Sequence, residues 1–325
     1  MRSLRCCTVI PLALVALFQP ARAQDFPNKP VTLIVPYAPG AATDTIARLL
    51  GQRLEQRLGK PLVVENRTGA GTLIGASHVA RSVPDGYTLL HATSTTMAIN
   101  VRLYKKLPYD PAKDFAPVAL VAGVPFILVV NPSLPINSIA DLVKVANSKP
   151  GALAFASSGP GSAAHLYAEL VKSMTGIEMT HVPYRGLAPA LNDLVAGHVS
   201  LMFGDFGTSL ELVRAGKLRA LGVSTAQRNP AAPDIPPIAE AGLPGYEASA
   251  WHMIVAPAKT PKPIVDRLNA DFRAIASEPD VQKELIARGM TPLVTAPPAE
   301  LARFVESEIA RWGGVVDKAG IAGSE

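Results

Sequence analysis

The chain has 325 residues, of which 48% are hydrophobic and 18% are charged, and its formal net charge at pH 7 is +5. This length is enough for two domains, each with its own core. The Lys and Arg residues form no cluster and no RNA-type aromatic motif occurs, so nucleic acid is not expected as a partner.

The first 23 residues have the pattern of a secretory signal peptide. Arg2 and Arg5 make a basic start, residues 9–18 are apolar, and residues 21–23 read A-x-A, which predicts cleavage before Gln24. The apolar stretch is too short to span a bilayer. Removal of the segment lowers the number of Lys and Arg residues from 31 to 28 against 26 acidic residues, a net charge of +2. It also removes both cysteines, so disulfides, thiol nucleophiles and thiolate metal sites are not expected.

Residues 31–58 predict a strand, a tight turn and a helix. Residues 31–35 are apolar and β-branched, residues 36–40 are rich in Pro and Gly, and apolar residues then recur at helical spacing until Gly59. Free backbone N–H groups and the positive end of the helix dipole would point at one place, where an anion is the natural occupant. The same pattern fits the first unit of any α/β protein, so this stretch alone leaves both interpretations open.

Two further units of this kind follow. A strand at 62–66 leads through the Gly-rich turn 67–72 into a helix from 73 to about 82, and a strand at 87–92 leads into the hydroxyl-rich residues 93–96. Three such units predict a parallel, doubly wound sheet. A polar connection at 108–117 and an apolar run at 118–130, broken by Gly123 and Pro125, mark the first crossing to a second domain.

The second half repeats the α/β pattern and then returns. Strands are expected at 152–156, 179–182, 199–203 and 218–224, with helices beginning near 138, after 162, at 189 and at 210. A Pro-rich loop at 227–247 leads to a return strand at 251–256. Two helices then complete the chain, one beginning at Thr260-Pro261 and one with its apolar residues at helical spacing.

Three turns rich in glycine or serine precede predicted helices, at 39–43, 69–72 and 157–162. Ligands bind at the carboxyl ends of strands in open α/β sheets, so these turns and the hydroxyl cluster at 94–96 predict a site for a small anion or polar ligand. The Gly-rich turn at 69–75 lacks the acidic residue that a dinucleotide site needs further on, and the histidines show no metal spacing. No cofactor and no metal are therefore expected.

Several polar residues leave alternatives open. A hydrolase needs a nucleophile and a base; Ser162 and His165 lie three residues apart on one helix face, although no G-x-S-x-G elbow occurs and such a histidine is more often a packing residue. Arg185 could pair with a carboxylate or lie in solvent. Asp44 could favour the helix dipole or contact a ligand, and Asp205 is ambiguous in the same way.

Longer motifs run in order along the chain. They are PVTLIVPYAPG at 30–40 with Thr43-Asp44, VENRTGAG at 64–71, PDGY at 84–87, YDP at 109–111 with KDF at 113–115, SSGPGS at 157–162 with His165, PYRG at 183–186, PDIP at 233–236 with IAEAGLPGY at 238–246, and Trp251 with Ala256-Pro257. In these motifs the chain resembles the Bug-type solute receptors, the TctC-like receptors of tripartite tricarboxylate transporters.

The resemblance implies an α/β, two-lobed periplasmic binding protein of type II, a Venus flytrap in which each lobe is a mostly parallel sheet flanked by helices. Lobe 1 would comprise 24–124 and 249–325, and lobe 2 would comprise 125–248. The protein would be a monomeric periplasmic receptor, not an enzyme. It would capture a small organic carboxylate between its lobes, partly through bridging waters, and deliver it to the membrane subunits of a tripartite transporter. The alternative is a secreted serine-dependent hydrolase of small esters or amides.

The predicted ligand set combines the residues carried over from the family with the hydroxyl cluster. It consists of Pro39, Gly40, Ala41, Thr43, Asp44, Gly71, Thr72, Ser94, Thr95, Ser157, Ser158, Gly159, Gly161, Ser162, His165, Tyr184, Arg185, Gly186 and Asp205. Three positions depart from the family pattern. Ala41 stands where a Gly is frequent, Arg185 replaces a common Lys, and residues 203–206 differ from the usual segment, which leaves the role of Asp205 open.

Overall fold

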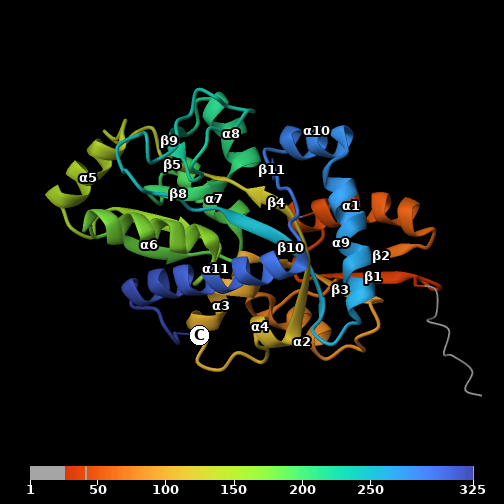
Figure 1. Ribbon diagram of the computed structural model, residues 1–325. Coiled ribbons are helices and arrows are strands. Elements are labelled where there is room, and N and C mark those ends of the chain that lie inside the picture. The colour runs from red at the N-terminus through yellow and green to blue at the C-terminus, as the bar shows by residue number, and fades with distance from the viewer. Residues whose placement is uncertain (1–25, 41, 325) are drawn as a thin grey trace, which may run out of the picture.

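The computed structural model describes residues 26–40 and 42–324. The predicted signal peptide, its cleavage site and Ala41 lie outside the described residues. The strands form two separate sheets, one of six strands and one of five, and helices flank both sheets. The chain therefore forms two α/β lobes, as the sequence predicts (Figure 1).

Lobe 1 is built from both ends of the chain. Its elements are β1 (Val31–Val35), α1 (Ala42–Leu58), β2 (Leu62–Asn66), η1 (Ala70–Thr72), α2 (Leu73–Ala80), β3 (Thr88–Thr93), η2 (Thr95–Ile99), α3 (Asn100–Leu103), α4 (Pro111–Asp114), β4 (Phe115–Val124), β10 (Ala250–Pro257), α9 (Lys262–Ala276), α10 (Pro279–Ala287), β11 (Thr291–Pro292) and α11 (Pro298–Lys318). The strand order is β11-β4-β10-β3-β1-β2, and β1 runs parallel to β2 and β3. The turns that follow these three strands therefore share one edge of the sheet.

Lobe 2 is built from the middle of the chain. Its elements are β5 (Phe126–Val130), α5 (Ile139–Ser148), β6 (Ala154–Ser157), α6 (Ala163–Thr175), β7 (Thr180–Pro183), α7 (Leu187–Ala196), β8 (Leu201–Asp205), α8 (Phe206–Arg214) and β9 (Arg219–Val223). The strand order is β7-β6-β8-β5-β9. Because β6 runs parallel to both β7 and β8, the turns after these three strands also share an edge.

Both sheets are mixed. The predicted βαβ units pair in parallel, but β10 runs antiparallel to β3 and β4, and β5 runs antiparallel to β8 and β9. The reason lies in the two crossings. Both β5 and β10 enter their lobe from the other lobe. Each therefore begins at the edge of the sheet where its neighbouring strands end, and runs opposite to them.

β4 ends at Val124 in the sheet of lobe 1, and β5 begins at Phe126 in the sheet of lobe 2. β4 begins earlier than expected, at Phe115, inside the segment predicted to be a polar connection. Phe115 is buried and pairs with Pro257 of β10. Pairing with the return strand therefore adds residues 115–117 to the beginning of β4. The lobe boundaries themselves, 24–124 with 249–325 and 125–248, stay predictions.

The helices begin where local sequence favours it. Ser138 caps α5, because its Oγ accepts from Asp141 N at 3.0 Å, while the Asp141 carboxylate accepts from Asn137 N at 3.0 Å. Proline lies at the first turn of α9, α10 and α11, where its missing N–H is not needed. None of the described helices is long and apolar enough to cross a membrane.

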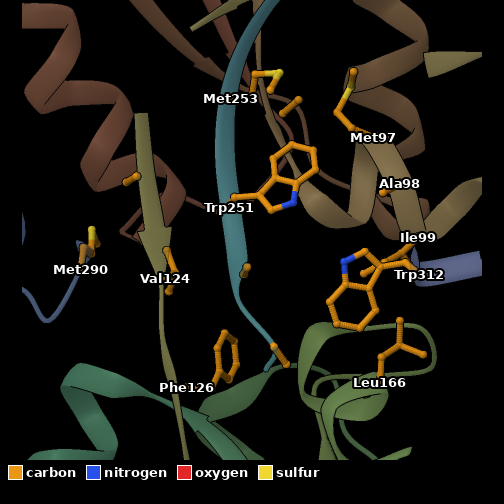
Figure 2. Packing of buried hydrophobic residues seen from close by; sticks show 14 of the residues in the cluster. Met97, Ala98, Ile99, Val124, Phe126, Leu166, Trp251, Met253, Met290 and Trp312 are labelled. Carbon is orange, nitrogen blue, oxygen red and sulfur yellow. The ribbon is translucent and has the colours of Figure 1, made fainter. Parts of the chain in front are cut away.

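The last helix joins the two lobes. Figure 2 shows the indole nitrogens of Trp251 and Trp312 turned toward each other. Between them lies the buried Glu308, whose Oε2 accepts from Trp251 Nε1 at 2.7 Å and from Trp312 Nε1 at 3.0 Å. Arg311 Nη1 donates to the other oxygen of Glu308 at 3.2 Å, so the buried charge is compensated. The Trp312 ring also stacks on Tyr167 of α6, with centroids 5.6 Å apart, which connects α11 to lobe 2.

Candidate functional site

The turn after β1 is held by the carboxylate of Asp44. Its Oδ2 accepts from Gly40 N at 2.9 Å and Arg48 Nε at 3.0 Å, and its Oδ1 accepts from Arg48 Nη2 at 3.0 Å and Asn66 Nδ2 at 2.9 Å. Burial acts to raise the pKa of Asp44, but these hydrogen bonds outweigh it and lower the pKa to about 2. Four accepted bonds fill the lone pairs of a carboxylate. Asp44 therefore braces the turn that contains Pro39 and Gly40.

A chain of hydroxyl groups runs between the turns of lobe 1, and its members are buried except for the half-buried Tyr37. Tyr37 Oη lies 2.9 Å from Thr93 Oγ1, which lies 3.4 Å from Thr96 Oγ1. The Thr96 hydroxyl donates to Thr72 Oγ1 at 3.0 Å. Burial raises the pKa of Tyr37 more than its hydrogen bonds lower it, so the phenol keeps its proton. This chain links the turn after β1 to the turn after β2.

The predicted residues Ser94 and Thr95 lie at the start of η2, which is a single π-helical turn. Ser94 is buried, and the side chain of Thr95 hydrogen-bonds to Tyr37. Thr43, in the first turn of α1, is also buried. Single π-turns occur often at functional sites. Ser94 and Thr95 therefore lie next to the hydroxyl chain that begins at Tyr37, and Thr43 lies at the start of α1.

Turn 69–72 of lobe 1 is strained. The φ angles are +128° at Gly69, +45° at Ala70, +56° at Gly71 and +83° at Thr72. Ala70 and Thr72 carry a Cβ, and such a conformation costs roughly 1–3 kcal/mol per residue. Asn100 Nδ2 donates to Gly71 O at 3.0 Å and lies 3.4 Å from Thr72 Oγ1. A Cβ at Gly71 would lie 2.5 Å from the Tyr104 hydroxyl, so the turn is held from two sides.

The corresponding loop of lobe 2, residues 157–162, is held by its own serines. Ser157 Oγ accepts from Gly159 N at 3.1 Å and donates to Gly159 O at 3.0 Å. Ser162 Oγ donates to Gly159 O at 2.7 Å and caps α6 by accepting from His165 N at 3.4 Å. Ser157 and His165 are buried, whereas Ser158 and Ser162 are partly exposed. Ser158 and Ser162 are therefore the serines of this loop nearest the surface, but the single proton of Ser162 Oγ already goes to Gly159 O.

Ser162 and His165 do not form a nucleophile–base pair. Nδ1 of His165 accepts from Gly161 N at 3.0 Å, while the Ser162 hydroxyl donates to a backbone carbonyl. Burial, followed by the charges of His181 and Lys172, lowers the pKa of His165 to about 3. A general base near neutral pH needs a much higher pKa.

The segment 184–186 lies beside this loop. Tyr184 N donates to Ser157 O at 2.9 Å, and the Tyr184 hydroxyl donates to Asp193 Oδ2 at 2.6 Å. Arg185 is exposed, and Gly186 precedes α7. The sheet edge thus brings these three predicted residues next to the loop 157–162.

Asp205 lies at the same edge of lobe 2, at the end of β8. It caps α8, because its Oδ1 accepts from Thr208 N at 3.1 Å and its Oδ2 accepts from the Thr208 hydroxyl. It also pairs with Phe126, the first residue after the crossing. Asp205 therefore has a local structural role, close to the place where the chain first crosses from lobe 1 to lobe 2.

One helical turn, α3, touches the predicted turns of both lobes. Asn100 at its start donates to Gly71 of lobe 1. Leu103 at its end packs against Gly161 of lobe 2, where an added Cβ would lie 1.9 Å from Leu103 Cδ2. The two predicted turns, far apart in the sequence, therefore meet at α3.

The sequence prediction missed the side chains that hold these turns. They are Tyr37, Arg48, Asn66, Asn100 and His181. Tyr37 lies just after β1 and Asn66 ends β2, and a polar residue at a strand end is a signal that could have identified both. Asn100 and His181 carry no such signal.

Comparisons with known proteins show the family to which the chain belongs. Residues 46–321 match the family model described as "Tripartite tricarboxylate transporter family receptor". Protein BugT of Bordetella pertussis is 38% identical over 310 residues, which cover 95% of this chain and 95% of BugT. The structure of R. palustris Rpa4515 with adipate has 43% identity and a TM-score of 0.83, covering 92% of this chain and 99% of that one. MatC from Rhodopseudomonas palustris with bound malate has 37% identity and a TM-score of 0.78, with 90% and 100% covered. The chain therefore belongs to the Bug-type receptor family of the tripartite tricarboxylate transporters.

Proposed function

We propose that the protein is a periplasmic receptor that captures a small organic dicarboxylate between its lobes and delivers it to the membrane subunits of a tripartite transporter. The observation that supports this most is the meeting of turns from both lobes at α3, through Asn100 and Leu103. The ligands named in the Rpa4515 and MatC structures, adipate and malate, are both dicarboxylates. A ligand with two charged ends suits a site with one turn from each lobe.

The chemistry of the turns favours neutral donors. Within the predicted ligand set, Arg185 is the one permanently cationic side chain, and Arg48 nearby is bound to Asp44. Carboxylates would therefore be held by backbone N–H groups at the starts of α1 and α6, by the Ser158 hydroxyl, and by bridging waters. Each hydrogen bond to a charged group contributes roughly 1.5–3 kcal/mol. Three or four of them, less the ordering costs, correspond to a Kd of about 1 μM or below.

The receptor works as a monomer, after export and cleavage before Gln24, and releases its ligand unchanged. Intact-mass analysis of protein from the periplasm tests the cleavage site. Recovery of the ligand after incubation tests the absence of turnover. Catalytic conversion that disappears in Ser162→Ala would instead support the serine hydrolase.

Calorimetry with adipate, malate, a tricarboxylate and a monocarboxylate tests the ligand class. We expect saturable binding of at least one dicarboxylate, with one site per chain and weaker binding of the monocarboxylate. Ser158→Ala should weaken that binding. Failure of every acid in the panel to bind would contradict the proposed function.

A further inference from the structure

Each end of the loop 157–162 is held by a different histidine. At one end, Ser157 Oγ lies 2.7 Å from His181 Nε2, and at the other, Gly161 N donates to His165 Nδ1 at 3.0 Å. His181 belongs to β7 and His165 to α6. The loop is therefore tied to two elements that come together only in the folded lobe.

These bonds determine where the imidazole protons lie. Because Gly161 N donates, Nδ1 of His165 is unprotonated, and the neutral ring carries its proton on Nε2. Assigning the single proton of the Ser157 hydroxyl to Gly159 O at 3.0 Å makes His181 Nε2 the donor to Ser157 Oγ, whereas the other tautomer of His181 would accept from that hydroxyl. The Gly161 bond makes His165 the neutral Nε2–H tautomer, and with the proton assigned in this way His181 is the same tautomer.

The two imidazoles lie on each other, with ring centroids 3.8 Å apart and an angle of 6° between the planes. The Phe155 ring extends the stack at 4.9 Å from His181. The charged groups near the pair are Glu169 and Lys172 of α6, which bind each other at 2.7 Å, and Glu169 Oε1 lies 3.8 Å from His165 Nε2. Burial and then Lys172 lower the pKa of His181 to about 4. Two neutral rings are therefore the stable form at neutral pH.

We propose that His165 and His181 are positioning residues that act as one unit, whose neutral imidazoles fix the loop 157–162 in its ligand-binding conformation. The proposal rests on the proposed function, because the loop is part of the proposed ligand site. A proton on Nδ1 of His165 would face the Gly161 N–H, donor against donor, and remove that bond. Gly161 also packs on the uncharged Leu103 of lobe 1, so the same change disturbs the contact between the lobes.

A first test needs no ligand. In the wild-type protein labelled with ¹⁵N-histidine, NMR at pH 7 should show Nδ1 of His165 unprotonated and Nε2 of both rings protonated. The Gly161 amide should exchange slowly with solvent. A proton on Nδ1 of His165, or fast exchange of the Gly161 amide, would overturn the proposal.

A second test uses variants that separate stacking from hydrogen bonding. His165→Phe keeps an aromatic ring in the stack and removes the acceptor, whereas His165→Asn offers an oxygen near the position of Nδ1. We expect His165→Phe to speed exchange of the Gly161 amide and to weaken adipate binding by about tenfold, as for one lost hydrogen bond, and His165→Asn to restore both. At the other end of the loop, His181→Phe keeps an aromatic ring but removes the hydrogen bond to Ser157, and His181→Gln keeps a polar group that can bond to Ser157. His78→Gln in lobe 1 is the control.

The pH profile distinguishes positioning from a general loss of stability. Wild-type affinity for adipate should fall as the pH drops through 4, where His181 takes up a proton, while the affinity of His181→Gln should fall less. If wild-type protein binds none of the acids, the proposed function fails, and amide exchange still decides the positioning role. Unchanged Gly161 exchange in His165→Phe would overturn the inference whatever the ligand data show.

Discussion

The ligand turns of the two lobes are held in place by different chemistry. In lobe 1, Ala70 and Thr72 adopt positive φ at an energetic cost, and the amide of Asn100 holds the turn. In lobe 2, the positive-φ positions are glycines, Gly159 at +123° and Gly161 at +67°, which adopt such angles without a Cβ clash. Imidazoles instead of an amide hold that loop.

The two sets of contacts therefore have different structural roles. A strained turn needs bonds that oppose its relaxation, whereas a glycine loop has many accessible conformations and needs bonds that select one. An amide does not titrate, and an imidazole does. We therefore expect acid to affect the loop of lobe 2 before it affects the turn of lobe 1.

The largest expected effect concerns the histidines within the sheet of lobe 1, where His252 Nδ1 lies 3.2 Å from His91 Nε2. Burial lowers the pKa of His252 to about 4. Because the folded state binds fewer protons than the unfolded state between pH 6.5 and 4, the free energy of unfolding falls as the pH drops through this window, by roughly 3 kcal/mol for His252. Urea unfolding at several pH values should show a shallower slope for His252→Asn. An unchanged slope would contradict this, and His198→Gln on the surface of lobe 2 is the control.

Gly161→Val should break the contact between the lobes. An added Cβ alone would lie 1.9 Å from Leu103 Cδ2, at a φ of +67°. We expect affinity for adipate, measured by calorimetry, to fall at least ~100-fold, about 2.7 kcal/mol. Gly176→Val is the matched control, because Gly176 has a φ of +74° and nothing within 4 Å of an added Cβ. Equal losses of affinity in both variants would show that backbone strain, not the Leu103 contact, is responsible.

Asn100→Leu should destabilise the strained turn of lobe 1. The change keeps the side-chain size but removes the donor to Gly71 O, and we expect the free energy of unfolding in urea to fall by roughly 1–3 kcal/mol. Its adipate affinity should keep the pH dependence of the wild type, because an amide does not titrate. Asn137→Leu, at an exposed position, is the control. A changed pH dependence in Asn100→Leu would remove the distinction between the lobes.

The smallest expected effect separates two neighbouring serines. Ser158 is partly exposed and Ser157 is fully buried. Ser158→Ala should weaken adipate binding by roughly 1 kcal/mol without changing stability; this is less than a full hydrogen bond to a charged group, because water can replace the lost hydroxyl at this partly exposed position. Ser157→Ala should lower stability in urea, because it removes the partner of His181. The opposite pattern would mean that Ser157 contacts the ligand.

The turns could be found from sequence because their signal is local. Glycine and serine gather between a strand and a helix, and the strands predicted at 31–35 and 62–66 match β1 and β2 residue for residue. The side chains that hold the turns could not be found in this way. His181 bonds to a residue 24 positions away and Asn100 to one 29 positions away, and such pairs depend on a strand order that the sequence does not specify.

The roles of some predicted residues also depend on packing. Asp44, Ser157 and His165 belong to the predicted ligand set, although the sequence leaves Asp44 and His165 open between a ligand contact and a structural role, and all three are buried and bonded to the turns themselves. A polar residue at a strand end looks the same in sequence whether it faces a ligand or supports the loop that does. The ligand set therefore stays a prediction, with these three residues placed in supporting positions.

The contacts of α11 with both lobes offer a way to detect movement between the lobes. The chain has two tryptophans, and both donate to Glu308, while Trp312 also stacks on Tyr167 of lobe 2. Indole emission depends on ring contacts and on nearby charge. A movement that separates Trp312 from Tyr167 should therefore change the intrinsic fluorescence of the native protein, so that closure on a ligand can be followed in solution without an attached dye.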